Sequence, residues 1–342
     1  MRMLIKSLAL AASLSFAAGT AFADNLPIKF TLDWKAQGPH SWFYLAKEKG
    51  YFADEGLDVT IDQGEGSSAA VTRVMSGTYD AGFGDINALI RAAAKAPDEA
   101  PVMVYLVYNG APFAIISKKD GDVQSLKELE GKTVAAPTGS ATFQLFPALA
   151  EANGFDAGKV ELLNASQNLI EQMLVRGQAD AIAQFGQTSY MNFIAMDLDP
   201  NEDFNWFYYS DNGLDLYSNG IIVSRKLIEE HPEAVEGLVT AINKAIMDVV
   251  ADPAVGIEAL VEVEPLTDNK LETERLQYTI DNQLETDETA EIGLGDLDMQ
   301  RLENSIAMNA NLETFDTVPE ASAIFDGSFL PEKSERMLPT AN

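Results

Sequence analysis

The chain has 342 residues, no cysteine, and 53 acidic side chains against 23 lysines and arginines, which gives a net charge of -30 at pH 7. So negative a chain repels nucleic acid and anionic lipid, and the lack of cysteine excludes disulfides, thiolate nucleophiles and a lipid-modified cysteine anchor. With 46% hydrophobic residues, the chain is expected to fold as two globular domains with a solvated acidic surface.

The first residues have the pattern of a secretory signal. Residues 1–23 combine a basic start at Arg2 with an apolar run at 8–18 and an Ala-Phe-Ala sequence at 21–23, which is typical of a cleavage site. The apolar run is shorter than the roughly 20 residues that a membrane-spanning helix needs. We therefore expect a soluble protein that begins near Asp24, is exported to the periplasm of a Gram-negative bacterium and is not anchored to the membrane.

Strands and helices alternate through the next part of the chain. Ser67 or Ser68 is expected to cap one helix and Asp85 the next, while Gly50 and Gly77 are expected to end helices. Such alternation predicts a parallel sheet covered by helices. The predicted strands are residues 28–32, 57–61, 79–85 and 101–108, and the predicted helices are residues 41–49, about 68–76, and 86–94.

A second unit of the same kind follows residue 110. One of its helices carries Pro147, which predicts either a kink or a delayed start of that helix. The predicted strands of this unit are residues 132–137, 159–166 and 179–185, with helices between Ser125 and Gly131 and at 168–176. After residue 221 the pattern is helical, at 232–251, 255–263, 271–284 and 298–309.

The two units share features in the same order along the chain, which predicts two related α/β lobes. In the first unit Gly50 and Gly77 are expected to end helices, and an Asp-Ala pair occurs at residues 80–81. The corresponding residues of the second unit are Gly154, Gly177 and the Asp-Ala pair at 180–181.

The chain is expected to cross between the lobes twice, at residues 109–113 and 217–221. Lobe I then consists of residues 24–110 and 222–342 and is discontinuous, whereas lobe II consists of residues 111–221. Two crossing segments between two lobes make a hinge.

Ligands of open α/β sheets bind beyond the carboxyl ends of the strands, where loops meet helix N-termini. Two facing lobes would place all such loops around one cleft. The candidate ligand-binding residues are Asp33, Trp34, Gln37, His40, Ser67, Phe83, Asp85, Ser140, Thr142, Gln184, Phe185, Tyr217 and Asn219.

Asp33 and Trp34 stand out because a carboxylate accepts hydrogen bonds from an amino group and an indole offers a large, rigid apolar face. The alternative is that Asp33 caps a turn and Trp34 is core. Ser67 and Ser140 begin helices, so N-H groups there could receive an anion, or the serines could be simple caps. Gln184 and Gln187 offer neutral hydrogen bonds and leave the ligand's charge open.

The sequence predicts no catalytic residue, metal site or cofactor. Its two histidines, His40 and His231, are far apart, and they form neither a His-Glu-x-x-His zinc motif nor a serine protease triad.

Six stretches of the sequence together resemble the ABC-transporter solute-binding proteins of the thiamine-pyrimidine, ThiY-like type. This type belongs to a superfamily that also holds taurine, alkanesulfonate and nitrate binders. The resemblance covers nearly the whole mature chain and implies the type II periplasmic binding protein fold, with two α/β lobes joined by two hinge strands. The stretches are LDWKAQGPH, YLAKEKGYFADEGLDVTI, GSSAAVTRVMSGTYDAGFGD, LKELEGKTVAAPTGS, YSNGIIVS and FDGSFLP.

In those binders an acid of the LDW motif meets a polar edge of the heterocycle and the aromatic stacks on it, and the resemblance implies these roles for Asp33 and Trp34. It also implies a monomeric receptor, not an enzyme, that delivers an aminopyrimidine thiamine precursor or a related flat heterocycle to an inner-membrane ABC permease. A binder of taurine, another alkanesulfonate or a small anion is the alternative.

An enzyme is a further alternative, because yeast pyrimidine synthases share this fold, resemble the region around His40 and consume a histidine as substrate. The alternative is disfavoured, since those enzymes carry a cysteine-rich iron-binding motif and this chain has no cysteine.

Overall fold

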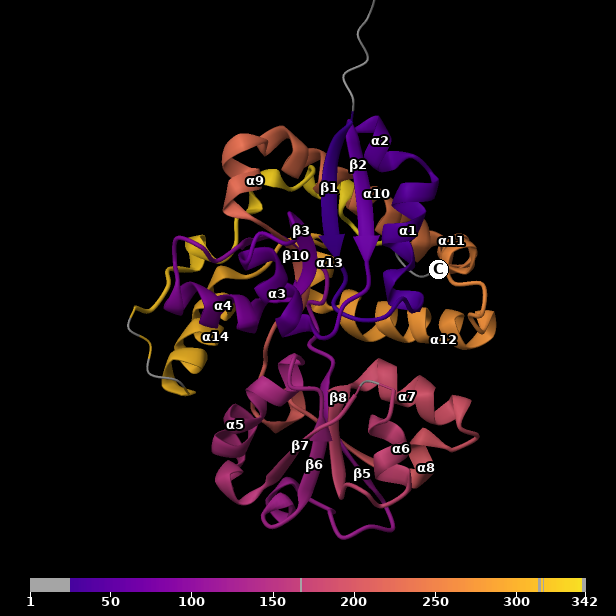
Figure 1. Ribbon diagram of the computed structural model, residues 1–342, viewed down its shortest axis with the longest axis vertical. Helices are drawn as coiled ribbons and strands as arrows, with labels where there is room; N and C mark the ends of the chain where they lie inside the picture. The colour runs from indigo at the N-terminus through magenta and orange to yellow at the C-terminus, as the bar shows by residue number, and fades with distance from the viewer. Residues whose placement is uncertain (1–24, 167, 313–314, 316, 340–342) are drawn as a thin grey trace, which may run out of the picture.

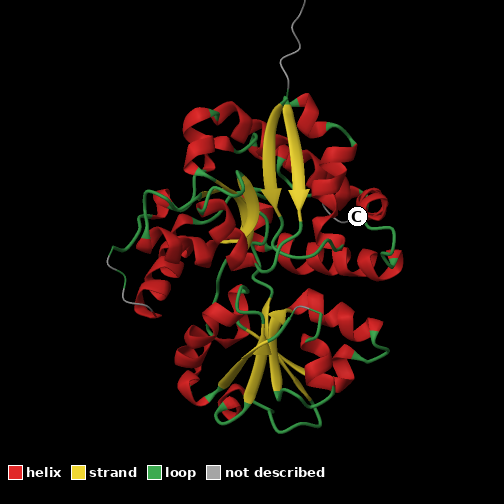
Figure 2. Cartoon of the chain, in the orientation of Figure 1, coloured by secondary structure: helices red, strands yellow, loops and turns green. Residues whose placement is uncertain are grey.

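The computed structural model describes residues 25–166, 168–312, 315 and 317–339, so the predicted signal at residues 1–23 lies outside the described residues. The chain forms two lobes (Figure 1), and each is built on one five-stranded sheet with helices packed against it (Figure 2). The sheet of lobe I contains β1 (Leu26–Thr31), β2 (Leu57–Asp62), β3 (Ala81–Asp85), β4 (Val102–Leu106) and β10 (Asn219–Val223). The sheet of lobe II contains β5 (Phe113–Lys118), β6 (Thr133–Ala136), β7 (Glu161–Asn164), β8 (Ala181–Phe185) and β9 (Phe204–Tyr208).

The two sheets have the same topology, in the order β2-β1-β3-β10-β4 in lobe I and β7-β6-β8-β5-β9 in lobe II. The four strands predicted for lobe I, β1 to β4, run parallel to one another, whereas β10 and β5 run antiparallel to both of their neighbours. Each of these strands arrives from the other lobe, so it starts at the cleft and runs away from it. The other strands end at the cleft, which brings their loops together there.

The crossings lie between β4 and β5, at residues 107–112, and between β9 and β10, at residues 209–218. The predicted lobe boundary at residue 221 therefore falls inside β10, and the first residues of that strand belong to the sheet of lobe I.

The internal repeat is visible in matching contacts at the starts of β3 and β8. The Asp80 carboxylate accepts a hydrogen bond from the Lys29 backbone N-H at 2.8 Å, and Asp180 accepts one from Thr133 at 2.8 Å. The four predicted helix-ending glycines all have positive φ, a conformation that glycine adopts without strain.

Most helices belong to lobe I. They are α1 (Ser41–Glu48), α2 (Tyr51–Asp54), α3 (Ser67–Met75), α4 (Ile86–Lys95), α9 (Arg225–Glu230), α10 (Pro232–Ala251), α11 (Pro253–Val263), α12 (Asn269–Thr279), α13 (Asp287–Ile292) and α14 (Met299–Leu312). Lobe II carries α5 (Ala141–Asn153), α6 (Ile170–Val175), α7 (Gly186–Ala195) and α8 (Pro200–Asp203). Within the described ranges, no helix combines the length and the apolar character that crossing a membrane requires.

The starts of helices α3 and α5 differ from the predictions. The N-cap of α3 is Gly66, so the prediction that Ser67 or Ser68 caps this helix is wrong; both serines are already helical. Helix α5 starts at Ala141, capped by Ser140, and runs through Pro147. Of the two predictions made for Pro147, the delayed start is therefore wrong.

Candidate functional site

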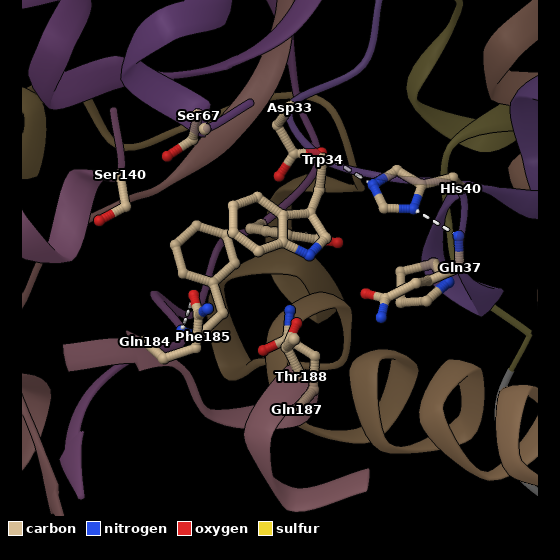
Figure 3. Close-up of a pocket in the computed structure, with 13 residues that line it drawn as sticks. Asp33, Trp34, Gln37, His40, Ser67, Ser140, Gln184, Phe185, Gln187 and Thr188 are labelled. Atoms are coloured by element: carbon tan, nitrogen blue, oxygen red, sulfur yellow. Dashed lines mark hydrogen bonds and ion pairs between the residues drawn. The ribbon is translucent and has the colours of Figure 1, made fainter. Parts of the chain in front are cut away.

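A narrow cavity lies between the lobes at the carboxyl ends of the strands (Figure 3). About 390 Å³ between its walls is free of protein atoms, solvent at the mouth included. We call this cavity the slot. Its lining residues are Asp33, Trp34, Gln37, Pro39, His40, Gly66, Ser67, Tyr108, Ser140, Gln184, Phe185, Gln187 and Thr188.

Asp33 follows the end of β1 and is almost fully buried, with 4% of its surface exposed. One carboxylate oxygen accepts a hydrogen bond from the His40 ring at 2.8 Å, and the other accepts one from the Asn219 side chain at 2.8 Å. Each carboxylate oxygen has two acceptor positions. The two protein donors therefore leave acceptor capacity for hydrogen bonds from a ligand.

The hydrogen bonds of His40 indicate which ring nitrogen carries the proton. The backbone N-H of Gln37 donates to Nδ1 of His40 at 3.1 Å, so that nitrogen carries a lone pair. The ring proton is then on Nε2, which donates to Asp33. In this tautomer the His40 ring orients the Asp33 carboxylate.

The loop at residues 64–66 holds the backbone of the Asp33-Trp34 pair. The N-H of Gly66 donates to the Asp33 carbonyl at 2.7 Å and that of Gly64 to the Trp34 carbonyl at 2.9 Å. A Cβ atom on Gly64 would lie 2.0 Å from the Leu32 carbonyl oxygen, so only glycine permits this approach.

Trp34 is buried, with 7% of its surface exposed, yet it belongs to none of the hydrophobic core clusters found among the described residues. Its indole lies in the middle of the drawn side chains in Figure 3. Nε1 is buried and has no hydrogen-bond partner within the part of the chain that the structure describes. Trp34 is thus a wall of the cavity, with a donor that a ligand could satisfy.

Lobe II supplies the opposite wall from the end of β8 and the first turn of α7. Gln184, Gln187 and Phe185 are all buried. Nε2 of Gln184 and Oε1 of Gln187 lack partners among the described residues. Since a buried polar atom without a partner costs free energy, these atoms mark positions where a ligand would form hydrogen bonds.

Tyr108 joins the two walls because it lies in the first crossing segment. Burial is the main reason that its pKa is raised well above the usual value, with the negative charge of Asp33 adding to the effect. The phenol is therefore protonated at every physiological pH.

The lobes touch at the helix N-termini that were proposed to hold an anion. The Gly139 carbonyl accepts hydrogen bonds from the N-H groups of Ser68 and Ala69 in α3, at 3.1 and 3.3 Å. The Ser67 hydroxyl accepts one from the N-H of Ala141 in α5 at 3.2 Å. These N-H groups are occupied by the facing lobe, and the lobes are closed.

Two predicted site residues support the cavity without lining it. Asn219, the first residue of β10, donates to Asp33. Phe83 is core, and its ring packs edge-on against His40 at 6.3 Å between centroids.

Three further predicted site residues lie outside the cavity wall. Asp85 accepts a hydrogen bond from the Ala88 N-H and caps α4, and burial raises the pKa of its carboxyl. Thr142 contacts the hydroxyl of Ser140, and Tyr217 donates its hydroxyl to Glu288 at the hinge.

The remaining predicted residues, Asp33, Trp34, Gln37, His40, Ser67, Ser140, Gln184 and Phe185, all line the cavity. Gln187 was predicted to offer a neutral hydrogen bond but was not among the candidate ligand-binding residues. Four other lining residues were not predicted: Pro39, Gly66, Tyr108 and Thr188. Pro39 and Gly66 fall inside motifs that had been recognised. Tyr108 ends a predicted strand next to a crossing, and that position could have identified it.

The cavity wall carries one formal charge, the Asp33 carboxylate, and no lysine or arginine among the described lining residues. Within the described ranges no group of three or more histidine, cysteine or acidic side chains is arranged to hold a metal ion. The site is chemically a binding surface of acceptors, two unpaired donors and aromatic faces.

Comparisons with known proteins agree with this architecture. A 4-amino-5-hydroxymethyl-2-methylpyrimidine phosphate synthase of Aspergillus parasiticus is 24% identical over 248 residues, 70% of this chain and 71% of that protein. A formylaminopyrimidine-binding protein of Halalkalibacterium halodurans is 26% identical over 236 residues, 68% and 69% of the two chains. The riboflavin-binding protein RibY of Chloroflexus aurantiacus is 26% identical over 277 residues, 75% and 73%.

Among solved structures, the alkanesulfonate-binding protein SsuA from Xanthomonas axonopodis pv. citri bound to MOPS superposes with a TM-score of 0.68. It is 16% identical and covers 89% of this chain and 100% of its own. This likeness confirms the predicted type II periplasmic binding protein fold. The family model described as NMT1/THI5 like matches residues 37–255, more than half of the sequence. The chain belongs to the NMT1/THI5-like family.

Proposed function

We propose that this protein is a receptor that closes its lobes on a flat, uncharged nitrogen heterocycle with an amino group, best an aminopyrimidine thiamine precursor. After export to the periplasm it delivers this nutrient to an inner-membrane ABC permease. The observation that carries the proposal is the buried Asp33 carboxylate beside the Trp34 indole, in a slot whose described lining residues include no cation.

The polar atoms of the slot match such a ligand. The carboxylate of Asp33 and Oε1 of Gln187 are acceptors, which suit an exocyclic amino group. Nε1 of Trp34 and Nε2 of Gln184 are donors, which suit ring nitrogens or a hydroxyl. The Trp34 indole gives a planar ring a face to stack on, and the formylaminopyrimidine- and riboflavin-binding relatives are named for flat nitrogen heterocycles.

A sulfonate or other small anion fits less well. The Asp33 charge repels an anion, and helix N-H groups that would receive one at Ser68, Ala69 and Ala141 already donate to the facing lobe. An enzyme related to the pyrimidine synthase is the competing class, and it differs from a receptor in consuming what it binds.

A thermal-shift screen tests the ligand class directly. Partial unfolding and refolding first removes any carried-over ligand. We expect 4-amino-5-hydroxymethyl-2-methylpyrimidine or its formylamino analogue to raise the melting temperature by several degrees at about 100 times Kd. Stabilisation by taurine, alkanesulfonates or nitrate alone would overturn the proposal.

The same samples separate a receptor from an enzyme. After long incubation with the protein, mass spectrometry should recover the pyrimidine unaltered. A product with a changed mass, formed in proportion to time and protein, would support the enzyme instead.

Replacing Trp34 by alanine is expected to weaken pyrimidine binding by about 1 to 3 kcal/mol, the usual contribution of stacking a base on an aromatic side chain. Isothermal titration calorimetry measures the loss. Trp34→Phe is the matched control, since it keeps a smaller aromatic face and removes the Nε1 donor. Unchanged affinity in Trp34→Ala would exclude the stacking role.

A further inference from the structure

A buried ion pair on α12 contacts both walls of the slot without lining it. Helix α12 belongs to lobe I, where it packs on α11 and on the turn at Gly38–His40, and its other side packs on α7 of lobe II. Figure 1 shows α12 along the edge of lobe I that faces α7. The pair is Glu272 and Arg275, whose side chains meet at 2.9 Å.

Arg275 is 1% exposed and directs its guanidinium into lobe II. Nη1 donates to the backbone carbonyls of Gln187 at 3.2 Å and Thr188 at 2.9 Å. Nη2 donates to the side-chain oxygen of Asn192 at 3.2 Å. Gln187 and Thr188 line the slot, whereas Arg275 does not. Arg275 therefore binds the backbone of the lobe II wall on the side that faces away from the slot.

Glu272 binds the turn that carries part of the lobe I wall. The carboxylate oxygen that pairs with Arg275 also accepts the backbone N-H of Gly38 at 2.7 Å. A Cβ on Gly38 would lie 2.2 Å from the Glu272 carbonyl oxygen, so the turn lies directly against the helix. This turn carries the lining residues Gln37 and His40.

The acceptors of Arg275 in lobe II are available only when the lobes are closed. Glu272 is on the same helix and stays with Arg275, whereas the two carbonyls and Asn192 belong to the other lobe. Asn192 in turn donates to the buried carboxylate of Glu171 at 3.0 Å, which orients its oxygen toward the guanidinium. Since a buried guanidinium needs acceptors for its N-H groups, these contacts favour closure.

We propose that Glu272 and Arg275 are positioning residues that set the spacing of the two walls and couple ligand affinity to lobe closure. This inference rests on the proposed receptor function. A ligand that contacts both lobes binds the closed form, so any contact made only in that form contributes to affinity.

Arg275→Met is the principal test. It keeps a long apolar side chain and removes every donor to lobe II. The Kd for 4-amino-5-hydroxymethyl-2-methylpyrimidine should rise at least about tenfold, because each hydrogen bond to a charged group contributes on the order of a tenfold factor. The increase should come from faster dissociation, measured by stopped-flow fluorescence. Arg275→Lys keeps the charge beside Glu272 but offers one ammonium group, so an intermediate loss is expected.

Lys270→Met is the matched control on the same helix. Lys270 is 88% exposed and pairs only loosely with Glu274, at 3.8 Å, so this variant should bind as the wild type does. If Arg275→Met binds as tightly as the control, the positioning role is wrong.

Lobe closure is measured separately, so that the inference does not depend on the choice of ligand. The chain has no cysteine, and Glu233→Cys in lobe I with Asp120→Cys in lobe II places one dye on each lobe for energy transfer. These side chains are 74% and 86% exposed. Relative to Lys270→Met, the Arg275→Met protein should be more open without ligand.

An unchanged dye distance with only a lower melting temperature would mean that the pair is merely structural and would overturn the inference. If the wild type binds no pyrimidine, the proposed function fails, and the dye distance still decides the role of Arg275. Should Arg275→Met fail to fold, Arg275→Lys and Glu272→Gln carry the same comparison.

Discussion

Replacing Asp33 by asparagine is expected to weaken aminopyrimidine binding by about 10- to 100-fold. Hydrogen bonds to a charged group are worth about 1.5 to 3 kcal/mol each, and 1.4 kcal/mol is a tenfold change in Kd. Asparagine has the same shape but only one acceptor oxygen, and His40 and Asn219 both already donate to this side chain. Its NH2 group therefore replaces one acceptor oxygen and faces either one of these two donors or the ligand. Calorimetric titration gives the change in Kd.

A change in the ligand tests more directly whether Asp33 contacts the amino group. A pyrimidine that lacks the amino group should bind the wild type weakly and lose little further affinity in Asp33→Asn, because the deleted contact is already missing. Asp58→Asn, an exposed position on β2, should leave both affinities unchanged. An equal loss for both pyrimidines would show that Asp33 maintains the cavity but does not recognise the amino group.

Local sequence patterns predicted most strands of the two sheets because their signals are local, but β5, β9 and helix α7 were not predicted. Helix α10 occurs at the predicted residues 232–251, and Gly50 and Gly77 end helices as expected. The part of the site that lies at strand ends could be predicted in the same way. Asp33 and Trp34 occupy a strand end, and strand ends of α/β lobes meet at the cleft.

The rest depends on contacts between segments far apart in the chain. That Asn219 bonds Asp33, or that Arg275 reaches the carbonyl of Thr188, follows from the packing of one lobe on the other. The start of β10 before residue 221 likewise depends on strand pairing with β3. No local pattern encodes these distances.

The same long-range packing bears on the charge of the ligand, which the sequence left open. Ser67 and Ser140 at helix starts could have served an anion or merely have capped the helices. In the closed protein the N-H groups of Ser68 and Ala69 donate to Gly139. An acidic wall and occupied helix termini together argue against an anionic ligand.

Replacing Gly139 by valine is expected to weaken ligand binding by about 10- to 100-fold, because the lobes meet backbone to backbone at this residue. A Cβ on Gly139 would lie 2.9 Å from the Glu65 carbonyl oxygen and 3.3 Å from the Ala69 Cβ, both in lobe I. Overpacking a close contact costs about 1 to 3 kcal/mol, and here the cost falls on the closed form alone. Gly139→Ala should give a smaller loss.

The open protein should tolerate the substitution, since the backbone of Gly139 is outside the positive-φ region that favours glycine. Its melting temperature without ligand should therefore stay close to that of Gly158→Val, a control at an exposed glycine of the same lobe, also without positive φ. Dye-labelled protein should show less closure on adding ligand. Because the bound form is the closed one, tight binding by a Gly139→Val protein that stays open would mean that the ligand needs only one lobe.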